Sequence, residues 1–132
     1  MAHRRFVLIN DEVHVVVVDD SPDAAEMLAL ALELDGYRVR IAGDGLQALA
    51  LITENQPHCV LLDIDMPGLD GFELAKCLRA QYEDEIVLIA VTGRAVDDSR
   101  VAGAFRIVDH HLAKPLDHGR LKKLLRPVRS SA

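Results

Sequence analysis

The residues of this sequence best suited to chemistry are acidic side chains that end two apolar runs. The run "CVLLD" ends in Asp63, and Asp65 follows two residues later. A second run, "VVVVDD", ends in Asp19 and Asp20, far upstream. Neighbouring carboxylates repel one another, and a hard divalent cation that binds their oxygens relieves the repulsion. These residue types predict a Mg²⁺ site if the fold brings the two clusters together.

Two more polar side chains follow predicted strands in the same manner. Thr92 ends the run "IVLIAVT", and Lys114 comes directly after "DHHLA". A lone lysine ammonium beside several carboxylates would balance the charge that a divalent cation leaves over. Both residues are therefore candidates for the same site.

The runs that carry these residues are predicted to be the strands of an α/β fold. Short runs, most of them rich in β-branched residues, predict strands at residues 13–18, 37–41, 59–63, 86–92 and 109–113. Residues typical of helix starts predict helices after Ser21, Asp44, Asp70 and Asp117, and a weaker helix around residues 96–105. Five such βα units form an open parallel sheet with helices on both faces.

This order of elements gathers the polar residues at one edge of the sheet. Right-handed crossovers make the carboxyl ends of all five strands point the same way. Ligands of such sheets bind outside that edge, where the strand order reverses. We therefore expect five side chains to converge on one shallow cleft: Asp19, Asp20, Asp63, Thr92 and Lys114.

The composition is that of a single soluble domain. The chain has 132 residues, of which 50% are hydrophobic and 27% charged, so that it can bury a core. Its formal net charge of −6 argues against a nucleic-acid-binding surface, which is usually basic. No apolar run approaches the ~18 residues of a membrane span, and the run at residues 6–9 is too short for a signal peptide.

The two cysteines, Cys59 and Cys77, fit no metal or redox spacing. We expect both to be reduced, buried thiols, as in a cytoplasmic protein. The sequence thus predicts a cytoplasmic location, with no nucleic-acid partner and no membrane partner for this chain.

Four motifs occur in order, each at a predicted strand end: "VVVVDDSPD", "VLLDIDMPGLDGFEL", "IAVTG" and "HLAKP". Together they resemble the CheY-like receiver domain of two-component response regulators, over roughly residues 13–126. The resemblance implies a single-domain, flavodoxin-like (βα)5 fold, doubly wound, with the five-stranded parallel sheet in the order 2-1-3-4-5. Residues 1–12 would then be an N-terminal extension or linker, and residues 127–132 a C-terminal tail.

The resemblance also implies roles for the site residues. Asp63 would be the phosphoacceptor, whose carboxylate attacks the phosphoryl group of a phosphohistidine on a partner. Lys114 would pair with one phosphoryl oxygen, and Thr92 would hydrogen-bond to another. The protein would be a self-phosphorylating switch with slow autodephosphorylation, not a turnover enzyme.

Metal binding and partners follow from the same resemblance. Asp20 would bind Mg²⁺ directly and Asp19 largely through water, Asp63 would share the ion, and the backbone carbonyl of Asp65 would supply another ligand. The phosphodonor would be a sensor histidine kinase or a histidine phosphotransfer domain. The output would pass to a downstream protein or to fused domains, with homodimer formation on phosphorylation left open.

Two features qualify this interpretation. His111 stands three residues before Lys114, where the family usually has a switching aromatic residue. A histidine titrates near neutrality, which leaves its part in any switch open. Pro115 follows Lys114, and in the family that peptide bond is often cis.

The sequence also offers alternatives to a phosphoacceptor receiver domain. The motif "LLDIDMP" contains the Asp-x-Asp of haloacid-dehalogenase-like phosphatases, but Pro67 follows Met66 where Thr or Val is usual. A degenerate receiver that only binds partners is a further alternative, which the complete set of site residues disfavours. Three histidines raise the alternative of a zinc site, but their spacing is poor and no cysteine is near: His110, His111 and His118.

Overall fold

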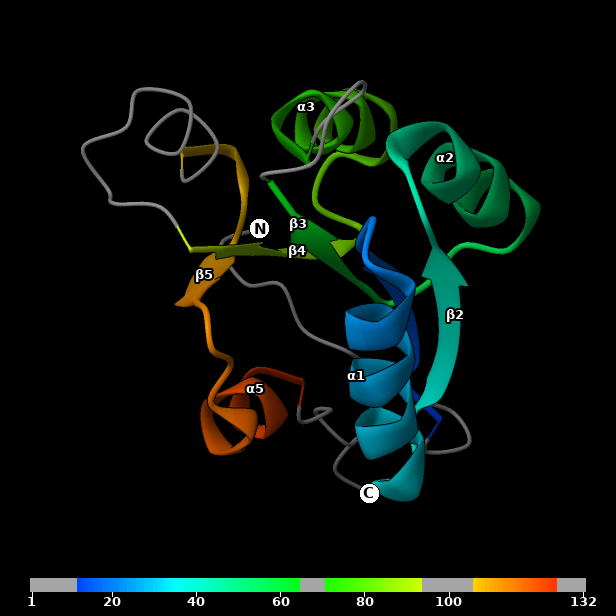
Figure 1. The fold of residues 1–132 in the computed structure, drawn as a ribbon. Coiled ribbons are helices and arrows are strands. Elements are labelled where there is room, and N and C mark those ends of the chain that lie inside the picture. Colours follow the sequence, from blue (N-terminus) through cyan, green and yellow to red (C-terminus); the bar gives the residue numbers. More distant parts are fainter. Residues whose placement is uncertain (1–11, 65–70, 94–105, 126–132) are drawn as a thin grey trace, which may run out of the picture.

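The computed structural model describes residues 12–64, 71–93 and 106–125 (Figure 1). Within them, one sheet contains five strands in the order β2-β1-β3-β4-β5. The strands are β1 (His14–Val18), β2 (Arg38–Ala42), β3 (Cys59–Asp63), β4 (Val87–Thr92) and β5 (His110–Ala113). The helices are α1 (Pro22–Leu34), α2 (Gly45–Glu54), α3 (Gly71–Tyr82) and α5 (His118–Leu125). The predicted doubly wound, flavodoxin-like sheet is confirmed, whereas the helix expected around residues 96–105 and the cap at Asp70 lie outside the described residues.

Every strand pair in this sheet is parallel, so all the carboxyl ends meet at the same edge. Leu62 of β3 pairs with Val18 of β1, and Asp63 pairs with Val91 of β4. On the other side of β4, Thr92 pairs with Ala113 of β5. The register therefore brings the residues that end these four strands to one level of the sheet.

In the described part of the chain, helices cover both faces of the sheet. Helices α1 and α5 lie on one face, and α2 and α3 lie on the other (Figure 1). Alternate residues of β1 divide between the two cores: Val15 and Val17 belong to the first, and Val16 and Val18 to the second. Burial on both faces explains why the central strands read as unbroken apolar runs.

The predicted helix starts at Ser21, Asp44 and Asp117 are present. The Ser21 hydroxyl accepts a hydrogen bond from the backbone amide of Ala24, at 3.4 Å. Asp44 Oδ1 accepts from the backbone amide of Gln47 at 2.8 Å. Asp117 Oδ1 accepts from the backbone amides of the second and third residues that follow it, at 2.9 and 3.2 Å. Each side chain satisfies amide groups that the helix itself leaves without an acceptor.

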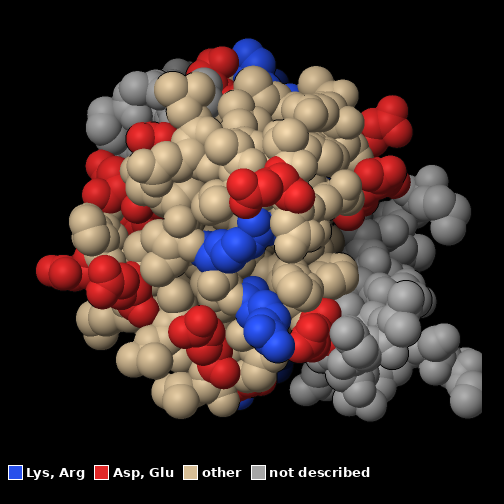
Figure 2. All heavy atoms as spheres, turned by 90° about the vertical axis from the view of Figure 1, so that its right-hand side faces the viewer, with Lys and Arg blue, Asp and Glu red and all other residues tan. Residues whose placement is uncertain are grey.

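Strand β2 forms an edge of the sheet, in agreement with the alternating pattern of its sequence. Its basic side chains, Arg38 and Arg40, stand on this edge, and Arg40 Nη1 donates to the carbonyl of Leu51 near the end of α2, at 2.9 Å. On this side of the molecule, basic side chains gather near the middle of the face, with acidic ones around them (Figure 2). Charged side chains on an edge strand disfavour pairing with another chain.

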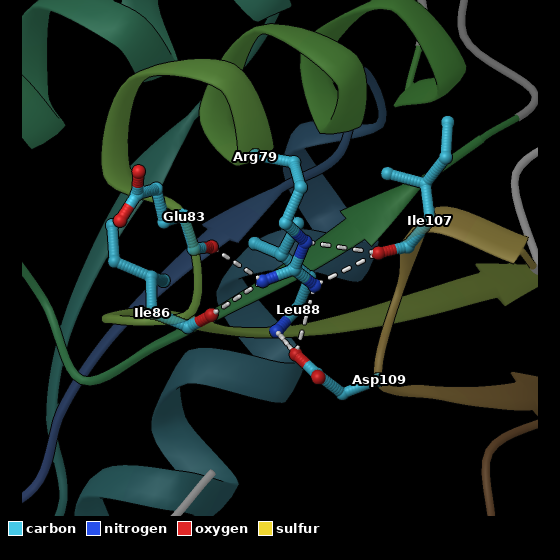
Figure 3. A network of polar contacts seen from close by, with 6 residues as sticks. All are labelled: Arg79, Glu83, Ile86, Leu88, Ile107 and Asp109. Atoms are coloured by element: carbon cyan, nitrogen blue, oxygen red, sulfur yellow. Dashed lines mark hydrogen bonds and ion pairs between the residues drawn. The ribbon is translucent and has the colours of Figure 1, made fainter. Parts of the chain in front are cut away.

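A half-buried arginine, Arg79 of α3, joins this helix to β4 and to the segment before β5 (Figure 3). Arg79 donates to the carbonyl of Ile107 at 2.8 and 3.1 Å, and to the carbonyl of Glu83 at 2.7 Å. Its Nη2 also lies 3.0 Å from Oδ2 of Asp109, and that oxygen accepts from the backbone amide of Leu88 at 2.8 Å. One planar guanidinium thus holds the end of α3, the start of β4 and the approach to β5.

The two cysteines have different environments. Cys59 is fully buried, and this burial raises the pKa of its thiol. Cys77 is exposed on α3, so the prediction of two buried thiols was wrong for this residue. Helix α3 buries Leu74, Ala75 and Leu78, and Cys77 lies off that stripe. In the described residues, no helix combines the length and apolar character that crossing a membrane needs.

Candidate functional site

Asp63 lies at the centre of the residues that the sequence singled out. It is the last residue of β3, only 5% of it is exposed, and Lys114 Nζ lies 3.1 Å from its Oδ2. Lys114 follows β5 directly, and its backbone amide donates to the carbonyl of Thr92 at 3.0 Å. The sheet therefore positions both members of this ion pair through backbone hydrogen bonds.

The second acidic cluster meets Asp63 as expected. Carboxylate oxygens of Asp19, Asp20 and Asp63 lie within 4.8 Å of one another, at the carboxyl ends of β1 and β3. Asp19 continues the backbone ladder, because its amide donates to the carbonyl of Ala42 at 3.1 Å. Burial decreases outward through the cluster, from Asp63 to the half-buried Asp19 and the exposed Asp20.

The surroundings of Asp19 disfavour the charged form of its carboxyl group. Burial is the main cause that raises the pKa of the Asp19 carboxyl, and the charge of Asp63 adds to it. The backbone amide of Ser21, which donates to Asp19 Oδ1 at 2.9 Å, acts in the opposite direction, as does Lys114. A cation held among these carboxylates would relieve both the desolvation and the repulsion.

The donor set fits a hard divalent cation. Three carboxylates offer oxygen atoms only, which Mg²⁺ prefers over the nitrogen and sulfur ligands typical of zinc. The exposed position of Asp20 leaves one side of the cluster open to water, and Mg²⁺ usually keeps several water ligands. Asp20 and Asp19 would hold the ion from β1, and Asp63 would hold it from β3.

The other residues that the sequence singled out lie at the following places in the structure. Thr92 ends β4, is 3% exposed, and lies between β3 and β5 at the same edge of the sheet. The Lys114–Pro115 peptide bond is cis, as the resemblance to receiver domains implied. Asp65 lies outside the described residues, so its part as a metal ligand stays a prediction. His111 is an exposed residue of β5.

Within the residues that the structure describes, the three aspartates are the one group of potential metal ligands that comes close enough to share an ion. The zinc alternative at His110, His111 and His118 therefore has no geometric support in that part of the chain.

Gly71 allows close packing between the start of α3 and the end of β3. A Cβ atom at this position would lie 2.4 Å from the carbonyl oxygen of Asp63 and 2.5 Å from Cα of Ile64. Only glycine lets the start of α3 approach the backbone of β3 this closely. The first turn of α3 is thereby packed directly behind the acidic cluster.

A family model described as "Response regulator receiver domain" matches residues 15–126. The chain belongs to this family. Among curated relatives, this receiver is 40% identical over 118 residues to "Response regulator MprA" of Mycobacterium sp. (strain KMS), covering 89% of this chain and 50% of that protein. It is 42% identical over 122 residues to "Transcriptional regulatory protein PrrA" of Mycobacterium tuberculosis, covering 89% and 52%. The chain thus spans about half the length of the curated relatives it matches.

Solved receiver structures share the fold. The Vibrio cholerae chemotaxis protein CheY4 is 28% identical with a TM-score of 0.77, and the match covers 89% of this chain and 99% of that one. The response regulator TrrA of Thermotoga maritima, solved in complex with Mg²⁺-BeF, is 28% identical with a TM-score of 0.75, covering 85% and 95%. The phosphatase alternative raised by the Asp-x-Asp motif is therefore not the family of this chain.

Proposed function

We propose that this receiver accepts a phosphoryl group on Asp63 in a Mg²⁺-dependent reaction. The observation that carries the proposal is the juxtaposition of Lys114 Nζ, 3.1 Å from Asp63 Oδ2, with the three-carboxylate cluster. A buried carboxylate between an ammonium and a cation site has both charges that a transferring phosphoryl group requires.

Asp63 acts as the nucleophile. One carboxylate oxygen attacks the phosphorus of a phosphohistidine, the P–N bond breaks, and the imidazole leaves with the bonding electron pair. Bound Mg²⁺ would neutralise charge on the transferring oxygens. Asp19 and Asp20 hold and orient that site from β1, and the closeness of α3 limits water access from behind Asp63.

Lys114 and Thr92 stabilise the group once it has been transferred. The Lys114 ammonium exchanges its contact with the Asp63 carboxylate for one with a phosphoryl oxygen, so the charge on Asp63 stays compensated. The Thr92 hydroxyl, at the end of the neighbouring strand, donates to another oxygen. The backbone carbonyl of Asp65 would supply a further metal ligand.

The similarity to TrrA, solved with Mg²⁺-BeF, supports the metal assignment. The similarity to MprA and PrrA supports a place in two-component signalling, with a sensor histidine kinase or histidine phosphotransfer domain as donor. We infer a receiver at residues 13–126 that works as a switch for a downstream protein or a fused domain, and not as a turnover enzyme.

Mass spectrometry of the intact chain tests the proposal. After incubation with Mg²⁺ and acetyl phosphate, the wild type should gain the mass of one phosphoryl group, and Asp63→Asn should not. Asp44→Asn is the matched control, because it removes a carboxylate that does not belong to the three-aspartate cluster and whose capping oxygen asparagine retains, and it should be modified like the wild type. An unmodified wild type would favour a degenerate receiver, and a modified Asp63→Asn would place the acceptor elsewhere.

A further inference from the structure

A cavity of about 500 Å³ opens between α1 and the start of α5, next to the acidic cluster. Val17, Leu61 and Val91 of the sheet form its floor. Ala24 and Ala31 of α1 line one side, and Leu116, just before α5, lines the other. Most of the lining is apolar, so the cavity suits an apolar body.

This space lies at one end of the two helices. Farther from the site, Leu121 and Leu125 of α5 are fully buried against the sheet, and Lys122 Nζ lies 3.6 Å from Asp35 Oδ1 at the end of α1. Near the site, Ala24, Met27, Leu28 and Ala31 of α1 line the space. The helices are thus joined at one end, and the cavity lies between them at the other.

The cavity has a charged end. Asp19, Asp63, Lys114 and His118 all contribute to its lining. The Lys114 ammonium is paired with Asp63 at 3.1 Å, so that, with histidine counted as neutral, the lining has one excess negative charge, on the half-buried Asp19. An aliphatic cavity that ends in an excess carboxylate is complementary to a cation with an apolar body.

We propose that this cavity binds a small amphipathic cation, with its aliphatic body between α1 and α5 and its ammonium group at the Asp19 carboxylate. The proposal does not depend on phosphorylation of Asp63. Because the ammonium group and Mg²⁺ both use Asp19, the two should oppose each other, and each should weaken the binding of the other by the same factor.

Binding of n-octylammonium to the full chain, in EDTA and without a phosphodonor, tests the proposal by calorimetry and methyl NMR. We expect one saturable site with a dissociation constant on the order of 1 mM or below, given the size of the probe. Octanoate has the same chain and the opposite charge, and should bind at least about 10-fold more weakly. Methylammonium lacks the chain and should not bind detectably, and added Mg²⁺ should weaken octylammonium binding.

Two variants test the location. Ala31→Leu fills the cavity with a good helix former and should weaken binding at least about 10-fold. The matched control is Leu30→Ala on the same helix, which removes an exposed apolar side chain outside the cavity and should bind like the wild type. Loss of binding in Leu30→Ala, or non-saturable binding, would overturn the proposal in favour of adsorption to the exposed surface of α1.

If Ala31→Leu does not fold, Asp19→Asn tests the proposed binding site instead. This variant keeps the cavity and should bind octylammonium no better than uncharged octanol. An unchanged preference for the cation would refute the part assigned to Asp19. Because these measurements need no phosphoryl transfer, their failure leaves the proposed phosphoacceptor role untouched, and failure of that role leaves them interpretable.

Discussion

Lys114 Nζ lies 3.1 Å from Asp63 Oδ2, across 51 positions of the chain. The two partners differ in burial, because the Asp63 side chain is 6% exposed and the Lys114 side chain is 40% exposed. The carboxylate is therefore fixed at the end of a buried strand, while the ammonium reaches it from solvent. Because its ammonium group is already partly in water, such a lysine can move outward together with a negative charge at little cost in desolvation.

Mg²⁺ should stabilise the folded chain, because the carboxylate cluster proposed to hold it exists only when β1 and β3 are paired. At about 10 times the dissociation constant, the free energy of unfolding should rise by about 1.4 kcal/mol, or about 5 °C in melting temperature. Differential scanning fluorimetry with Mg²⁺, and then with excess EDTA, measures the shift. Asp20→Asn should lose most of it while Asp44→Asn keeps it, and an equal shift in both would contradict the site.

Gly71→Ala should destabilise the fold, since the added Cβ would lie 2.4 Å from the carbonyl oxygen of Asp63 and the backbone there is held by β3. We expect a loss of about 2–3 kcal/mol in the free energy of unfolding, measured by urea denaturation. Gly43→Ala is the control, because its Cβ would meet only the flexible end of Gln47, at 3.5 Å. A Gly71→Ala chain as stable as Gly43→Ala would show that α3 can retreat from the site.

Arg79→Met should cost about 2–4 kcal/mol of stability, because it removes a charged donor from the Asp109 carboxylate and from the carbonyl of Ile107 in a largely buried region. Arg79→Lys should recover only part of this loss, since an ammonium cannot reproduce the planar set of donors. Lys76→Met on the same helix removes an exposed ion pair at 3.9 Å and should change stability by less than about 0.5 kcal/mol. Comparable losses at positions 76 and 79 would contradict the network.

His58 should make the fold less stable in mild acid. Its Nδ1 accepts a hydrogen bond from the backbone amide of His14 at 2.9 Å, and burial, together with the charge of His14, lowers the pKa of His58 below 6.5. The unfolded chain then binds more protons than the folded one. The free energy of unfolding should accordingly be highest above pH 6.5 and fall as the pH drops from there toward the folded-state pKa.

Urea denaturation at several pH values between about 5 and 8 measures this dependence. His58→Gln should flatten it, because glutamine offers an acceptor that does not titrate. His118→Gln replaces an exposed histidine and should leave the His58 contribution in place. An identical pH profile in His58→Gln and the wild type would exclude His58 as its source.

The strands and helix starts could be predicted because the causes are local. An apolar, β-branched run such as residues 14–18 specifies a buried strand by composition, and Asp44 specifies a helix start by the reach of its own side chain. The meeting of Asp19, Asp63 and Lys114 followed from topology alone, since parallel strands share one edge. Strand ends shifted by a residue, as at β2, where pairing with β1 sets the limits.

Other features depend on distances that no local pattern encodes. The cavity beside Asp19 lies between α1 and the start of α5, and predicting it would require knowing how far apart these helices stand. The Arg79 network joins carbonyls that are 4 and 28 positions away in the chain. The error at Cys77 was avoidable, because the helical spacing of Leu74, Ala75 and Leu78 already excludes it from the buried side.

The parallel register that aligns Asp63 with Val91, and Thr92 with Ala113, has an evolutionary consequence. The geometry of the reactive groups is set by main-chain ladders in the interior, and the outer surfaces of the helices have no part in it. After gene duplication, the exposed residues can diverge toward new recognition specificities while the inherited chemistry stays the same.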